Sequence, residues 1–128
     1  FHPERFKAWL DNWPGEIVRA KGFFWLASRN DMAGLISQAG ASIMIQGAGE
    51  WVASYSDEEK KLTLEEEPEL LERWDETYGD RMTELVFIGI EMEQKQIERS
   101  LDTCLLTEKE MNEDWSKLAD PVPAFIVE

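Results

Sequence analysis

The sequence is poor in the residues that hold small folds together covalently or through a metal. Its 128 residues include one cysteine, Cys104, and one histidine, His2. One cysteine excludes a disulfide within the chain, and one cysteine with one histidine does not fill the four positions of a structural zinc site. The length is still sufficient for one domain with its own core, so we expect a single domain, 1–128, stabilised by packing in a reducing, cytoplasmic setting.

Long apolar runs and positive charge are also scarce. No stretch approaches the roughly 20 apolar residues that cross a bilayer. Thirteen basic residues stand against 27 acidic ones, which gives a formal net charge of -14. Because this charge repels phosphate groups, we expect neither nucleic acid nor an anionic membrane as a partner.

The motifs of common enzymes are missing as well. The chain has no GxxxxGK(S/T) phosphate loop, no GxGxxG, no HExxH, no CxxC and no nucleophile elbow. We therefore expect no catalytic and no nucleotide-binding residue in this chain. Because it begins at Phe1 instead of a methionine, we also expect a fragment of a longer protein whose other part holds the chemistry.

Apolar segments are plentiful, and two of them predict neighbouring strands in the middle of a sheet. The aromatic run 21–27 indicates a buried strand covered on both faces, and the apolar run 84–90 indicates its partner. Segment 32–40 fits a helix or a strand. Its two glycines favour the strand, which would form a hairpin with the alternating residues 41–46.

Apolar residues at helical spacing predict helices over 3–13, 68–78 and 93–105. Thr107 and Glu110 have the spacing of a capping box, which predicts one more short helix. We therefore predict an α+β fold, in which a single layer of roughly four mainly antiparallel strands has helices packed on one face.

Two segments are expected to lie outside this core. Residues 57–67 are dominated by acidic side chains and are expected to form a flexible acidic loop. Residues 119–128 contain two prolines and are expected to form a tail.

Charged residues gather at the ends of the two predicted central strands, and they have two interpretations. One is an ion-pair network at the edge of the sheet. The other is a polar patch that docks another domain. Six tryptophans exceed what a small core usually needs, so one of them near the tail is a further candidate for an interface. The candidate docking residues are Lys21, Arg29, Asp80, Arg81, Glu84 and Trp115.

Five segments, in this order, resemble the C-terminal domain of the CobW family. They are FHPER at 1–5, KGFFWLASR at 21–29, SQAG at 37–40, GDR with ELVFIG at 79–89, and LDTCLLT at 101–107. The resemblance extends over nearly the whole chain and is nearest to the bacterial zinc-responsive members.

The resemblance implies a parent protein with an N-terminal P-loop GTPase domain followed by this α+β domain. Such proteins act in metal insertion, zinc homeostasis or cobalamin assembly. GTP, magnesium and zinc or cobalt are then implied for the parent, and no cofactor or metal is expected in this fragment. The implied partners are the chain's own GTPase domain and a metalloprotein client.

Three functions remain open at this point. The leading hypothesis is a non-catalytic docking or regulatory domain of a GTP-dependent metal chaperone. The second is an autonomous acidic metal-binding module that uses carboxylates of segment 57–76 with His2. The third is a small hydrolase in which Asp80 and Glu84 form an acid and base pair.

Overall fold

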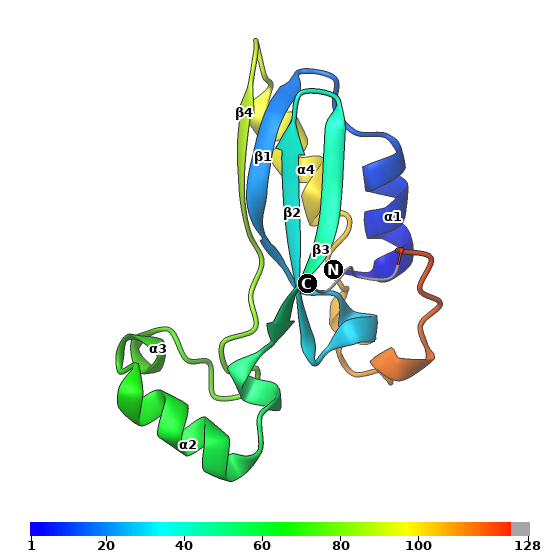
Figure 1. Cartoon of the computed structure of the whole chain (residues 1–128). Helices are drawn as coiled ribbons and strands as arrows, with labels where there is room; N and C mark the ends of the chain where they lie inside the picture. The colour runs from blue at the N-terminus through cyan, green and yellow to red at the C-terminus, as the bar shows by residue number, and fades with distance from the viewer. Residues whose placement is uncertain (124–128) are drawn as a thin grey trace.

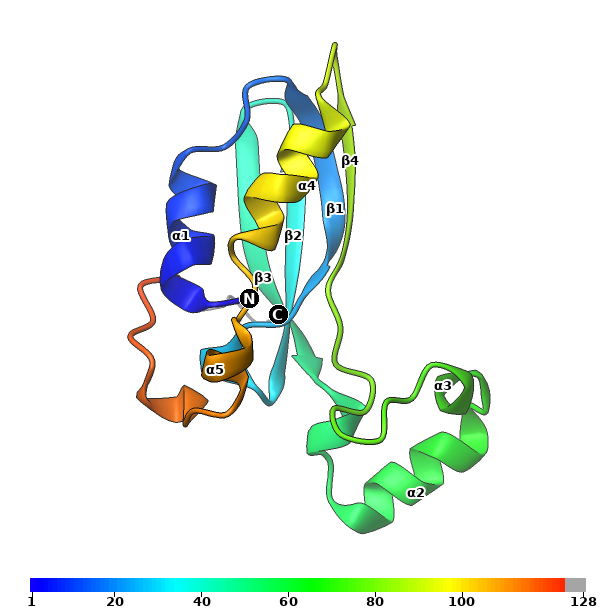
Figure 2. The same ribbon diagram turned by 180° about the vertical axis from the view of Figure 1, so that it is seen from behind.

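The computed structural model describes residues 1–123, so part of the predicted tail lies outside the described residues. Four strands form one sheet in the order β3-β2-β1-β4, and every neighbouring pair is antiparallel. Helices α1 and α4 lie side by side on one face of this sheet (Figures 1 and 2). The predicted α+β fold is confirmed. The strands are β1 (Ile17–Phe24), β2 (Met32–Ala39), β3 (Ser42–Glu50) and β4 (Glu84–Gly89).

The helices vary greatly in length. None of those within residues 1–123 is long and apolar enough to span a membrane. Short 3-10 turns follow β1 and β3 and precede the tail. The α-helices are α1 (Pro3–Asp11), α2 (Asp57–Glu66), α3 (Glu69–Glu72), α4 (Gln94–Asp102) and α5 (Glu108–Met111), and the 3-10 turns are Ala27–Arg29, Val52–Ser54 and Trp115–Lys117.

Helix α1 begins where proline and a side-chain cap favour it. Pro3 occupies the first turn, and the ring nitrogen Nδ1 of His2 accepts a hydrogen bond from the backbone N–H of Glu4 at 3.2 Å. Phe6 and Trp9 are buried on the face that the apolar spacing predicted. The predicted helix is thus confirmed, and it ends two residues before the predicted Trp13.

Segment 32–40 is a strand, as the glycine argument favoured. Ala39 pairs with Ser42, so only two residues connect β2 to β3. The first of them, Gly40, has a φ of 60°, which such tight hairpin turns require and which glycine adopts without steric cost. The predicted hairpin is confirmed.

The core lies between the sheet and the two helices α1 and α4. The ring of Phe6 stacks on that of Phe1 at a centroid distance of 4.5 Å and meets that of Phe24 at 4.9 Å. Ile97 brings α4 into the same cluster. Packing of aromatic rings therefore joins the N-terminal helix to the first strand.

Two expectations about the central strands are wrong. Strand β4 lies at an edge of the sheet because the hairpin places β2 on the other side of β1. Strand β1 ends at Phe24, and only one of its faces is covered. Phe24 is fully buried, whereas its neighbour Phe23 is 48% exposed on the opposite face.

The acidic excursion also differs from expectation. Residues 57–66 form helix α2 instead of a loop, because Ser56 Oγ accepts from the backbone N–H of Glu59 and acidic side chains occupy the first turn. The helix predicted over 68–78 shortens to Glu69–Glu72. It ends early because Asp75 Oδ1 accepts from the backbone N–H groups of Thr77 and Tyr78, which stabilises a turn.

Candidate docking site

Asp80 and Arg81 fasten the loop before β4 to the segment after β3. The carboxylate of Asp80 accepts from the backbone N–H groups of Val52 at 3.0 Å and Ala53 at 2.9 Å. Arg81 donates to the carbonyl of Asn30 at 2.6 Å and to Ser54 Oγ at 2.8 Å. This pair of residues joins three loops at one end of the sheet.

The ion-pair network that was one interpretation of these charged residues does not form at this edge. Within residues 1–123, Asp80, Arg81 and Glu84 make no ion pair with one another or with Lys21. Asp80 and Arg81 serve as hydrogen-bonding groups for backbone atoms and a hydroxyl instead. Burial lowers the pKa of Arg81, and the charges of Asp80 and Asp31 oppose that effect.

Trp115 packs in an aromatic cluster with residues that are distant in sequence. Its ring lies 5.8 Å from that of Trp25 and 6.1 Å from that of Tyr78, measured between centroids. The Trp115 indole N–H donates to the carbonyl of Glu110 at 2.9 Å. These contacts hold the partly exposed Trp115 in a fixed orientation.

Trp115 borders a hollow of about 350 Å³, which we call the aromatic hollow. Its wall is mostly apolar and comes from both ends of the chain. Leu105 in this wall is 47% exposed. Residues that line the hollow include Phe1, Trp25, Met82, Leu105, Met111 and Trp115.

Arg29 is occupied by the C-terminal part of the chain. Its Nε donates to Asp120 Oδ2 at 2.8 Å, and its guanidinium also bonds the carbonyls of Val122 and Pro123. Ser28 Oγ donates to the same carboxylate at 2.6 Å. Arg29 therefore holds residues 120–123 against the turn that follows β1.

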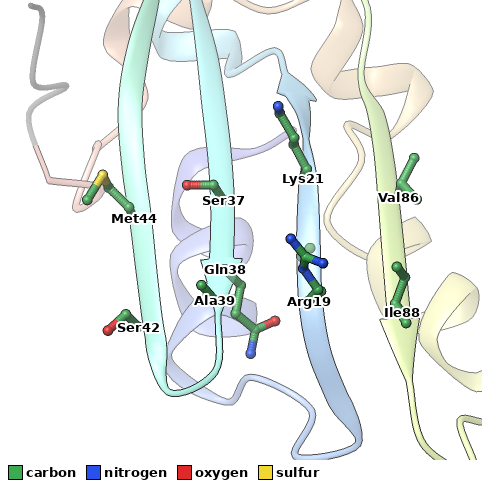
Figure 3. A pocket seen from close by; sticks show the side chains of 10 residues that line it. Arg19, Lys21, Ser37, Gln38, Ala39, Ser42, Met44, Val86 and Ile88 are labelled. Carbon is green, nitrogen blue, oxygen red and sulfur yellow. The ribbon is translucent and has the colours of Figure 1, made fainter.

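Lys21 and Glu84 lie on the other face of the sheet, which α1 and α4 leave uncovered. Both are exposed, Lys21 on β1 and Glu84 at the start of β4. Figure 3 shows Lys21 beside Arg19, with Val86 and Ile88 of β4 on one side. The six candidate residues thus divide between this face, the loops below the sheet and the aromatic hollow.

The sequence interpretation missed Arg19, Val86 and Ile88 on this open face. The available signal was period-two alternation, because Arg19, Lys21 and Phe23 alternate with Ala20 and Gly22. It was overlooked because both faces of β1 were expected to be buried.

The described residues offer no site for a metal. No group of three or more His, Cys, Asp or Glu side chains within 1–123 is arranged to hold an ion. His2 lies beside Glu110, with 3.5 Å between His2 Nε2 and Glu110 Oε2, and Cys104 is buried. Burial also raises the pKa of the Cys104 thiol.

Asp80 and Glu84, the acid and base pair of the third hypothesis, border one hollow of about 400 Å³, but their surroundings do not favour acid and base roles. Both carboxylate oxygens of Asp80 accept hydrogen bonds from backbone N–H groups, which ties this group to a structural role. Glu84 is exposed on a strand at the sheet edge. The backbone hydrogen bonds of Asp80 therefore favour a structural role over the hydrolase hypothesis.

Comparison with known proteins agrees with the resemblance seen in the sequence. Residues 1–105 match the family model of the cobalamin synthesis protein CobW C-terminal domain. The zinc-regulated GTPase metalloprotein activator 1 of Dictyostelium discoideum is 38% identical over 112 residues, which cover 84% of this chain and 23% of that protein. The zinc chaperone Rv0106 of Mycobacterium tuberculosis is 30% identical over 130 residues, or 94% of this chain and 31% of that protein.

No solved structure matches the chain. The chain spans less than a third of the length of these curated relatives, 23% of one and 31% of the other. The family model covers most of the chain, from α1 through α4, including the whole sheet. The chain therefore belongs to the family of CobW C-terminal domains.

Proposed function

We propose that this chain is a non-catalytic docking or regulatory domain of a GTP-dependent metal chaperone for zinc or cobalt. The observation that carries the proposal is family membership in a chain that lacks a phosphate loop. One relative is named as a GTPase metalloprotein activator and another as a zinc chaperone. GTP, magnesium and the transported metal are then held by another part of the protein, in the cytoplasm.

The aromatic hollow is the surface that we assign to the GTPase domain. It is apolar, and it is bordered by Trp115 and Arg81, residue types that are enriched at the centres of interfaces. Phe1 also lines the hollow, which adds a further aromatic side chain to this surface. The metalloprotein client remains free to bind elsewhere on the chain.

The proposal is tested with the GTPase portion of the parent protein as a separate polypeptide. We expect it to bind the 128-residue chain, and we expect Leu105→Ser to weaken that binding, because Leu105 presents exposed apolar surface in the hollow. Leu62→Ser on α2 is the matched control, since Leu62 is also exposed but lies away from the hollow.

Isothermal titration calorimetry gives the two affinities, and GTP turnover of the mixture gives the regulatory effect. Equal affinity of the Leu105→Ser variant and the unmodified chain would contradict the assignment of the hollow. GTP hydrolysis by the 128-residue chain alone would contradict the non-catalytic role.

A further inference from the structure

The open face of the sheet combines apolar side chains with two cations, Arg19 and Lys21, and it has a carboxylate, Glu84, at the start of β4. Arg19 lies opposite Ala39 of β2 and Ile88 of β4, and Lys21 lies opposite Ser37 and Val86. Val86 is 60% exposed and Ile88 is 56% exposed. The face is slightly hollowed, with a volume of about 440 Å³ over β1 and its neighbours (Figure 3).

The two cations are uncompensated in a strongly acidic protein. Neither Arg19 nor Lys21 forms an ion pair or a side-chain hydrogen bond within residues 1–123. The whole chain nevertheless carries a formal net charge of -14. Unpaired positive charge at the centre of a partly apolar face complements a partner that carries carboxylates among apolar side chains.

We propose that this open face is a docking site for an acidic amphipathic helix of a partner protein. Arg19 and Lys21 are two residues apart on β1, a separation of about 7 Å along the strand. Carboxylates four residues apart on a helix are separated by about 6 Å along its axis, so both can meet the two cations.

The width of the face also fits a helix. Exposed apolar side chains flank the cations on both sides, with Val86 on β4 and Met44 on β3. Three strand spacings separate β4 from β3, or about 14 Å. A helix with its side chains is about 10 to 12 Å wide and covers most of this width, whereas one extended segment covers about a single strand spacing.

Charge disfavours two other partners for this face, a second copy of the chain and an anionic membrane. In a symmetric pairing of two copies, the column of Arg19 and Lys21 would face the same column of the second copy. An anionic membrane would attract these two residues but repel the rest of the chain. A short acidic helix presents only a few carboxylates, so it meets less of this repulsion than a membrane surface does. This inference is independent of the GTP-related role, and its test uses only the 128-residue chain.

The test uses a synthetic 20-residue alanine-based helix with leucines on one face and glutamates at positions i and i+4 beside them. A second peptide has lysine in place of every glutamate. Each is titrated into the isotope-labelled chain and followed by NMR. We expect the acidic peptide to bind and the lysine peptide not to bind. Binding of the acidic peptide should shift the signals of β1, β2 and β4 near Arg19 and Lys21. Its affinity should fall as the salt concentration rises.

Arg19→Glu combined with Lys21→Glu is expected to weaken binding of the acidic peptide by about tenfold or more. Lys95→Glu combined with Arg99→Glu is the matched control, because both residues are exposed on α4 at the covered face. It should leave the affinity unchanged. Val86→Ser, a neutral substitution at an exposed position, should also weaken binding.

Four outcomes would overturn the proposal. They are equal binding of the two peptides, signal changes away from the open face, binding of phosphatidylserine vesicles through Arg19 and Lys21, and a dimer that buries this face in two copies of the chain. Undiminished binding by both the double charge reversal and Val86→Ser would overturn it as well.

Discussion

The two faces of the sheet are formed by the same strands but differ in burial and in charge. On the covered face, Phe24 and Ile36 are almost fully buried under α1 and α4. On the open face, Phe23 and Val86 are about half exposed and lie beside unpaired cations. One face therefore stabilises the fold, whereas side chains on the other face contribute little to the core.

The largest expected effect on stability comes from replacing one of two adjacent phenylalanines, Phe23 and Phe24. Phe24→Ala removes a fully buried ring and is expected to lower the free energy of unfolding by about 4 kcal/mol. Phe23→Ala is expected to lower it by about 1 kcal/mol or less, since its ring is 48% exposed. Urea denaturation followed by tryptophan fluorescence measures both. Similar losses for the two variants would remove the distinction between the faces.

A second test enlarges side chains. A Cβ atom on Gly34 would overlap the ring of Phe24, so Gly34→Ala is expected to destabilise the fold by about 2 kcal/mol. Ala39→Val, at an exposed position of the same strand, should cost far less. Thermal unfolding followed by circular dichroism compares the two variants. A tolerated Gly34→Ala would mean that the covered face is less tightly packed than described.

The smallest effect concerns charges that are paired on the helical side of the molecule. Arg5 Nη2 lies 2.5 Å from Glu110 Oε1, and hydrogen bonds from Arg5 and from the backbone of Thr107 lower the pKa of Glu110 to about 2. Because the folded-state pKa is below the ordinary value, this stabilisation is complete above about pH 4.5 and is lost as the pH falls towards 2.

Glu110→Gln is therefore expected to reduce the free energy of unfolding by about 1 kcal/mol at pH 7 and by much less near pH 2. Lys21→Gln on the open face should change little at either pH, because Lys21 has no ion-pair partner within residues 1–123. Urea denaturation at several pH values measures the gap between each variant and the unmodified chain. If the gap for Glu110→Gln were as large at pH 2 as at pH 7, this result would contradict the assigned ion pair.

Local sequence signals predicted most of the elements but not their arrangement. Helix α1, the hairpin of β2 and β3 and the capping box at Thr107 were predictable, because each depends on residues close together in the chain. The edge position of β4 was not, since apolar character alone does not specify the neighbours of a strand. Helix α2 was missed because acidic composition outweighed the cap at Ser56.

The candidate site was less predictable than the fold. The aromatic cluster joins Trp25, Tyr78 and Trp115 across long stretches of sequence, and no local pattern reports such contacts. Arg29 and Asp80 were singled out as docking residues from their positions at strand ends. In the folded chain each of them bonds neighbouring loops, which is a contact that a single sequence does not reveal.

In the function that we propose, the chain docks onto a GTPase domain and binds no nucleotide itself. Calorimetric titration of the 128-residue chain, first with magnesium and GTP and then with the GTPase portion of the parent, tests it most directly. We expect no heat of binding in the first step and saturable binding in the second. Micromolar binding of GTP by the chain alone, or no binding of the GTPase portion, would contradict it.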